Sequence, residues 1–114
     1  MICAQLKLEE NTLSLRLHGH AETGAPGFDP VCAAASVLAY TGAQIVKDLG
    51  SSGGLLKKPV IRLSPGDARI DAVPKKEMRN ALLCAFSVLQ VGFTLLARNF
   101  PDCVRLDTST EKPE

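Results

Sequence analysis

Cys32, His20 and Asp29 are the residues of this sequence whose types and spacing best support covalent chemistry. A cysteine nucleophile works with a base that takes and returns a proton near neutral pH, and histidine is the side chain suited to that task. The loop predicted between His20 and Cys32, residues 21–29, contains two glycines and a proline. A compact loop there would bring the imidazole and the thiol together, so the sequence predicts a cysteine–histidine pair.

Asp29 and Pro30 predict a helix that begins just before Cys32. Aspartate is favoured at the N-cap of a helix, and proline at the first helical position, where an N–H would have no partner. Unpaired backbone N–H groups and the helix dipole favour negative charge in the first turn, which suits a nucleophilic thiol. Cys32 also lies about 100° around the helix from the apolar Val31. The alternative is that Cys32 is a small buried apolar residue, as free cysteines usually are.

The neighbours of this pair have more than one interpretation. Asp29 either caps the helix by accepting the N–H of Cys32 or orients an imidazole as the acidic member of a triad. Ser36 either lines the same cleft or bonds a backbone carbonyl one turn back. His18, two residues before His20 on the same predicted strand face, competes as the base. His18, His20 and Cys32 are also plausible metal ligands, but their spacing is a weak match to a zinc site, so we expect no metal and no cofactor.

Alternating apolar residues predict two β-hairpins, and apolar residues at helical spacing predict two helices. The expected elements are strands at residues 2–8 and 12–20, a helix at 30–48 ending near Gly50, strands at 55–63 and 68–73, a helix at 75–98 and a strand at 103–107. The order β-β-α-β-β-α-β indicates an α+β domain with a mainly antiparallel sheet and two helices. We expect residues 1–107 to form this single domain and residues 108–114 to form a polar tail.

The composition excludes several classes of protein. A chain of 114 residues has room for one core, and its formal net charge of +1 lacks the basic excess on which direct nucleic-acid binding relies. The N-terminal residues do not resemble a secretion signal, and no two of the four cysteines have Cys-x-x-Cys spacing. We therefore expect reduced cysteines and a cytoplasmic protein.

The second predicted helix is apolar on nearly all faces between residues 81 and 97. This run is short for a bilayer, which needs about 20 apolar residues, so we expect no membrane contact. A helix that is apolar all round must be covered on more than one side. One small sheet covers one side, so we expect a second subunit, related by two-fold symmetry, to cover another.

Two segments on either side of residues 22–26 form a specific pattern, which is Gly-His-Ala followed, after a glycine-containing loop, by Gly-x-Asp-x-Val-Cys-Ala-Ala-x-Ser. The segments are Gly19-His20-Ala21 and Gly27-Phe28-Asp29-Pro30-Val31-Cys32-Ala33-Ala34-Ala35-Ser36. This pattern resembles the signature of the ribosomal-processing cysteine protease family (Prp, YsxB-like). The chain length, the element order and an aromatic-Pro-Asp turn near residue 101 add support. Pro30 departs from the aliphatic residue common in the family and removes a backbone donor there.

The resemblance implies that Cys32 is the nucleophile, His20 the general base and Asp29 a supporting acid. It also implies backbone N–H donors at the helix start, including that of Cys32, for the oxyanion, and a substrate-responsive lid at residues 21–28 that contains Gly24 and Gly27. The implied activity is removal of a short N-terminal extension from large-subunit ribosomal protein L-twenty-seven, through an acyl-enzyme, by a homodimer. The alternative is a non-catalytic, dimeric ribosome-assembly factor that holds a peptide in the same cleft.

Overall fold

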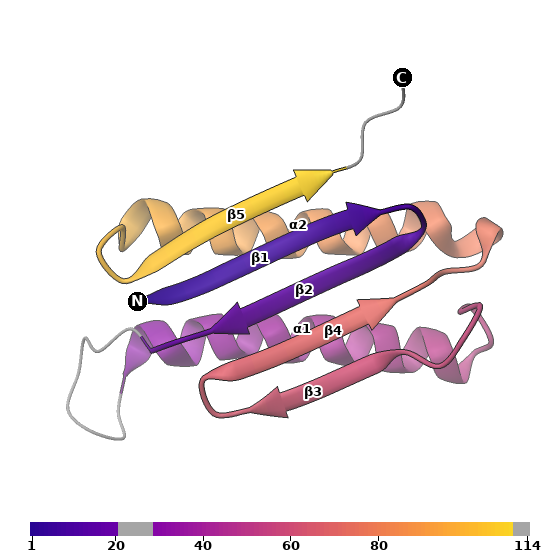
Figure 1. Ribbon diagram of the computed structural model, residues 1–114, viewed down its shortest axis with the longest axis horizontal. Helices are drawn as coiled ribbons and strands as arrows, with labels where there is room; N and C mark the ends of the chain where they lie inside the picture. Colours follow the sequence, from indigo (N-terminus) through magenta and orange to yellow (C-terminus); the bar gives the residue numbers. More distant parts are fainter. Residues whose placement is uncertain (21–28, 111–114) are drawn as a thin grey trace.

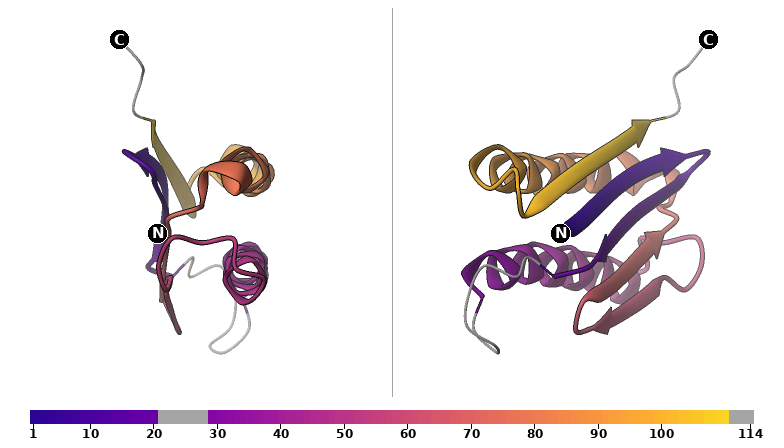
Figure 2. Two further views of the ribbon diagram at one scale, coloured as in Figure 1. Left: turned by 90° about the vertical axis from the view of Figure 1, so that its right-hand side faces the viewer. Right: turned by 60° about the vertical axis from the view of Figure 1, so that its left-hand side comes forward.

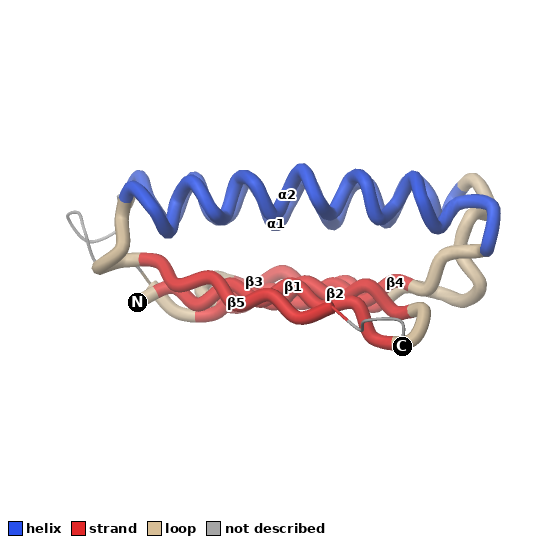
Figure 3. Tube along the Cα trace, turned by 90° about the horizontal axis from the view of Figure 1, so that it is seen from above, coloured by secondary structure: helices blue, strands red, loops and turns tan. Residues whose placement is uncertain are grey.

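Two helices lie side by side on one face of a five-stranded sheet, which gives the molecule two layers (Figures 1 and 3). The computed structural model describes residues 1–20 and 29–110. Its elements are β1 (Ile2–Glu9), β2 (Thr12–His18), α1 (Pro30–Ser51), β3 (Val60–Ser64), β4 (Asp67–Ala72), a 3-10 turn (Lys76–Met78), α2 (Arg79–Asn99) and β5 (Val104–Thr110). The predicted α+β class and element order are confirmed.

The strands lie in the order β3-β4-β2-β1-β5. Three of the four pairings are antiparallel, and β1 pairs with β5 in parallel, with Ile2 opposite Val104. A parallel partner cannot arrive through a tight turn, and β5 indeed reaches the sheet from the helix layer, after α2. The sheet is therefore mixed and mainly antiparallel, as predicted.

The sheet and the helices form two separate layers in the edge-on view (Figure 2), and the buried apolar side chains form the core between them. Strand residues of alternating position, such as Leu13, Leu15 and Leu17, point into it, which is the period of two seen in the sequence. The helices meet through small residues. A Cβ at Gly92 would lie 2.7 Å from Leu38 Cδ2, so that position has space only for hydrogen. This close approach lets α1 and α2 cover the sheet together.

Two strand boundaries differ from those predicted. β2 ends at His18 rather than at residue 20, because Gly19 adopts a φ of +101° and takes the chain out of the ladder. β3 begins at Val60 rather than at residue 55, and Leu55 makes only an isolated bridge with Pro74. The first of these differences decides where His20 lies.

The later elements also differ at their ends. α2 begins at Arg79, after the 3-10 turn, rather than at residue 75, and α1 continues to Ser51, beyond the predicted end near Gly50. β5 runs to Thr110, three residues past the predicted end of the domain, because β1 is long enough to pair with it as far as Leu8. The start of the predicted tail is thus part of the sheet.

The outer face of α2 is apolar and exposed. On length and composition alone, Lys76–Asn99 could cross a membrane, yet in the structure it lies along the sheet. Val88, Val91 and Leu95 on its outer face are 68%, 58% and 49% exposed. The residues that α2 buries are Leu82, Phe86, Leu89 and Phe93. The sheet therefore covers one side of this helix and leaves an apolar stripe on the other, as expected from the sequence.

Candidate active site

A pocket of about 280 Å³ opens where β2 ends and α1 begins. Four parts of the chain line it: the start of β1 at Ile2, the end of β2, the first turns of α1, and the turn between β3 and β4 (residues 64–67). The lining residues with polar side chains are His20, Cys32, Ser36, Tyr40, Ser64 and Asp67. Three residues predicted from the sequence, His20, Cys32 and Ser36, therefore converge on one cavity.

The start of α1 is built as the sequence predicts. Asp29 is the N-cap, and its Oδ1 accepts hydrogen bonds from the backbone N–H groups of Val31 at 2.9 Å and Cys32 at 3.1 Å. Pro30 occupies the first helical position. Cys32 thus lies in the first turn, where it is partly exposed and packs in part against the core. This position agrees better with a cysteine that lines a pocket than with a small apolar residue that is fully buried.

The cap occupies the backbone donors of this first turn. The N–H groups of Val31 and Cys32 donate to the Asp29 carboxylate, and the N–H of Ala33 donates to the Asp29 carbonyl at 3.0 Å. Pro30 has no N–H to offer. The Cys32 N–H, expected to serve an oxyanion, is therefore a helix-cap donor in this structure.

His20 lies just past the end of β2 and is exposed. Its carbonyl accepts a hydrogen bond from the Met1 amino group at 2.6 Å, and the N–H of the preceding Gly19 donates to the Gly66 carbonyl at 3.0 Å. Its imidazole lies against Gly66, because a Cβ at Gly66 would be 2.5 Å from His20 Nε2. The backbone and the ring of His20 are thus both held by neighbouring parts of the sheet.

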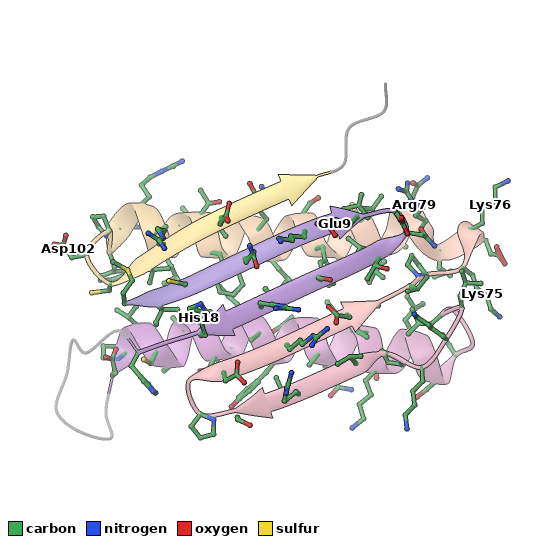
Figure 4. The ribbon with its side chains drawn as sticks, viewed as in Figure 1. Glu9, His18, Lys75, Lys76, Arg79 and Asp102 are labelled. Atoms are coloured by element: carbon green, nitrogen blue, oxygen red, sulfur yellow. The ribbon has the colours of Figure 1, made fainter. Side chains whose placement is uncertain are left out.

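His18 and His20 do not share a face, contrary to the prediction. His18 is the last residue of β2, where it is paired with Cys3 and Asp67, and it is exposed on the face away from the helices (Figure 4). Gly19 then redirects the chain, so that His20 lines the pocket instead. His18 is therefore too poorly placed to act as the base. Within residues 1–20 and 29–110, no group of three His, Cys, Asp or Glu side chains is arranged to hold a metal ion.

The β3–β4 turn is the part of the site that sequence reasoning missed. Its Ser-Pro-Gly-Asp sequence identifies a turn but contains nothing that connects it to His20. The connection comes from the pairing of β2 with β4, in which His18 lies opposite Asp67. The predicted lid at residues 21–28, with Gly24 and Gly27, lies outside the described residues and stays a prediction.

Comparison with known proteins gives a family. A family model described as "Cysteine protease Prp" matches residues 1–105. No curated protein matches the sequence. SMU.848 from Streptococcus mutans is 27% identical, with a TM-score of 0.64 over 97% of this chain and 96% of that one.

Two structures of the essential ribosomal processing protease Prp from S. aureus share the fold. One, in complex with a covalently linked product peptide, is 20% identical with a TM-score of 0.71, and the other, with a substrate peptide, is 16% identical with a TM-score of 0.64. Each alignment covers 95% of this chain and 99% of the other. Because the family model spans nearly the whole domain, including His20 and Cys32, the chain belongs to the Prp family and is a cysteine protease.

Proposed function

We propose that this protein is a cysteine endopeptidase that removes the N-terminal extension of large-subunit ribosomal protein L-twenty-seven, with Cys32 as nucleophile and His20 as general base. The observation that carries the proposal is the pocket that both side chains line, between the end of β2 and the start of α1. Membership of the Prp family supports the peptidase chemistry. The ribosomal processing role described for the S. aureus relative supports the class of substrate.

The reaction follows from the chemistry of a thiol beside an imidazole. His20 takes the proton of the Cys32 thiol, and the sulfur attacks the carbonyl carbon of the scissile peptide bond. The tetrahedral intermediate collapses, the C–N bond breaks, and the leaving amine takes the proton from His20. Water then gives a proton to His20 and attacks the thioester. The carboxylic acid is released, and Cys32 recovers its proton.

Asp29 and Ser36 have supporting roles in this proposal. Asp29 is a positioning residue, since its carboxylate accepts the N–H of Cys32 and fixes the turn that presents the thiol. An oxyanion at the same N–H would compete with this cap, so the substrate carbonyl needs another donor or a rearranged cap. Ser36 lies one helical turn after Cys32 and lines the same pocket, where its hydroxyl can bind the peptide backbone.

We further propose that the protein acts as a homodimer in the cytoplasm. The exposed stripe of Val88, Val91 and Leu95 on α2 is the surface that a second copy would cover. All four cysteines are free thiols, which suits a reducing compartment. The near-neutral charge of the chain favours recognition of a peptide segment over direct contact with nucleic acid.

The proposal is tested by incubating the ribosomal protein, with its extension, with the wild-type chain and with Cys32→Ala, and measuring intact masses. We expect the wild type to remove the extension and Cys32→Ala to leave the substrate whole, because Cys32 is the one cysteine among the described residues that line the pocket. Cys84→Ala is the matched control, since Cys84 is exposed on α2 and should be dispensable for cleavage.

Cleavage by Cys32→Ala at the wild-type rate would remove Cys32 from the mechanism. A different result, binding of the substrate without any cleavage by the wild type and with full biological function of Cys32→Ala, would identify a non-catalytic assembly factor instead. Trapping of a thioester on Cys32, seen as an added mass on the protein, would exclude that alternative.

A further inference from the structure

The β3–β4 turn lies so close to the His20 ring that a side chain at Gly66 would require the ring to move. A Cβ at Gly66 would lie 2.5 Å from His20 Nε2 and 2.7 Å from Cε1, well inside van der Waals contact. The imidazole therefore occupies the space that a side chain at Gly66 would need. Nε2, one of the two ring nitrogens that can take a proton, is on the edge of the imidazole that faces the turn.

The same turn also holds the backbone beside His20. The Gly66 carbonyl accepts the N–H of Gly19 at 3.0 Å, just beyond the last pair of the β2–β4 ladder, His18 with Asp67. The turn and the end of β2 consequently lie next to each other (Figure 1). His20 itself is exposed, and among the residues that the structure describes Gly66 is one that its ring lies against.

We propose that Gly66 is a positioning residue for His20. Its missing side chain leaves the space in which the imidazole lies, and the β3–β4 turn thereby sets the position of the base relative to Cys32. The inference rests on the proposed role of His20 as general base. A base must be within hydrogen-bond reach of the proton that it takes, and a misplacement of about 1 Å can lower a rate by about 10²-fold.

Gly66 also has a φ of +74°, which favours glycine for backbone reasons alone. Comparison with Gly53 distinguishes the two reasons for a glycine at position 66, the backbone conformation and the contact with His20. Its φ is +83°, and a Cβ there would meet nothing within 4 Å. The two glycines therefore share the left-handed backbone and differ in the contact with His20. Asparagine tolerates this conformation better than most residues, so Gly66→Asn and Gly53→Asn form a matched pair.

We expect Gly66→Asn to lower kcat for the ribosomal protein by about tenfold or more with little change in KM, and Gly53→Asn to leave both near their wild-type values. In a His20→Ala background, Gly66→Asn should cause no further loss, because the base that it displaces is already absent. An equal loss in both backgrounds would overturn the proposal. If Gly66→Asn does not fold, as judged by thermal unfolding, Gly66→Ala adds the Cβ alone and replaces it.

A second measurement needs no substrate. The chain has two histidines, so proton NMR gives two imidazole Cε1–H signals, and His18→Ala assigns both. We expect Gly66→Asn to shift the His20 signal and Gly53→Asn to leave it in place. An unmoved His20 signal in Gly66→Asn would overturn the positioning role. Failure of the wild type to cleave in a Cys32-dependent way would instead overturn the proposed function, and the NMR comparison would still report on the contact.

Discussion

The two helices cover the same face of the sheet, but they differ in where they carry functional surface. α1 begins with a side-chain cap from Asp29, and its first turns form a wall of the pocket. α2 begins at Arg79, directly after the 3-10 turn, its N-cap Met78 makes no side-chain cap, and the helix exposes an apolar stripe. α1 therefore contributes its N-terminal end to the pocket, whereas α2 presents an apolar side to the surface. The proposed chemistry and the proposed association thus lie on separate parts of the helix layer, and we expect substitutions to affect one without the other.

The largest effect is expected at the pocket, and the test compares the two histidines of the chain. We expect His20→Ala to lower kcat/KM for extension removal by about 10²- to 10⁴-fold, the usual loss when a general base is removed. His18→Ala is the matched control, because His18 lies two residues away on the opposite face of the sheet and should keep wild-type activity. Steady-state cleavage assays measure both. Equal losses in the two variants would mean that the face on which the histidine lies does not matter.

The proposed dimer contact on the exposed stripe of α2 is tested by introducing a charge there. Val88→Glu places a carboxylate in the exposed stripe, and in a two-fold dimer it would bring two like charges into an apolar contact. We expect the dissociation constant of the dimer to rise by about 10²-fold or more, as measured by analytical ultracentrifugation across a concentration series. Gln90→Glu adds the same charge at an exposed position on another side of the helix and should leave association unchanged. A wild-type chain that sediments as a monomer would refute the proposed dimer directly.

The smallest effect is expected at the cap of α1. Asp29→Ala removes the acceptor for two backbone N–H groups and should lower the free energy of unfolding by about 1 kcal/mol, measured by chemical denaturation. Asp29→Asn keeps an oxygen that can accept these bonds and should retain most of that stability. If activity follows stability in the two variants, Asp29 acts through the cap. If Asn is stable but inactive, the negative charge has a part in catalysis.

The features that depend only on residues close together in the sequence are predictable from it. Asp29 and Pro30 identify the start of α1 because capping is a local property, and alternation along β1 identifies its buried face. The signature around Cys32 then led to the family that the comparison confirms. These features need no knowledge of how distant segments meet.

The parts that were missed depend on conformation or on long-range pairing. A glycine between His18 and His20 permits either sign of φ, and the positive value at Gly19 placed the two histidines on different sides. The β3–β4 turn reaches His20 only because β2 pairs with β4, a register that no local pattern specifies. Two roles of the Cys32 N–H were compatible with the sequence, donor to the Asp29 cap and donor to an oxyanion, and the side-chain geometry shows that it donates to the cap.

The pairing of the first strand with the last has a consequence for the order in which the active protein is made. β1 leaves the ribosome early, but its second edge is filled only by Val104–Thr110, and Ile2, which lines the pocket, lies opposite Val104 in that pairing. Pairing between strands so distant in sequence requires both strands to exist and a long loop to close. The pocket therefore reaches its final shape only after the fifth strand has been synthesised and has paired with the first.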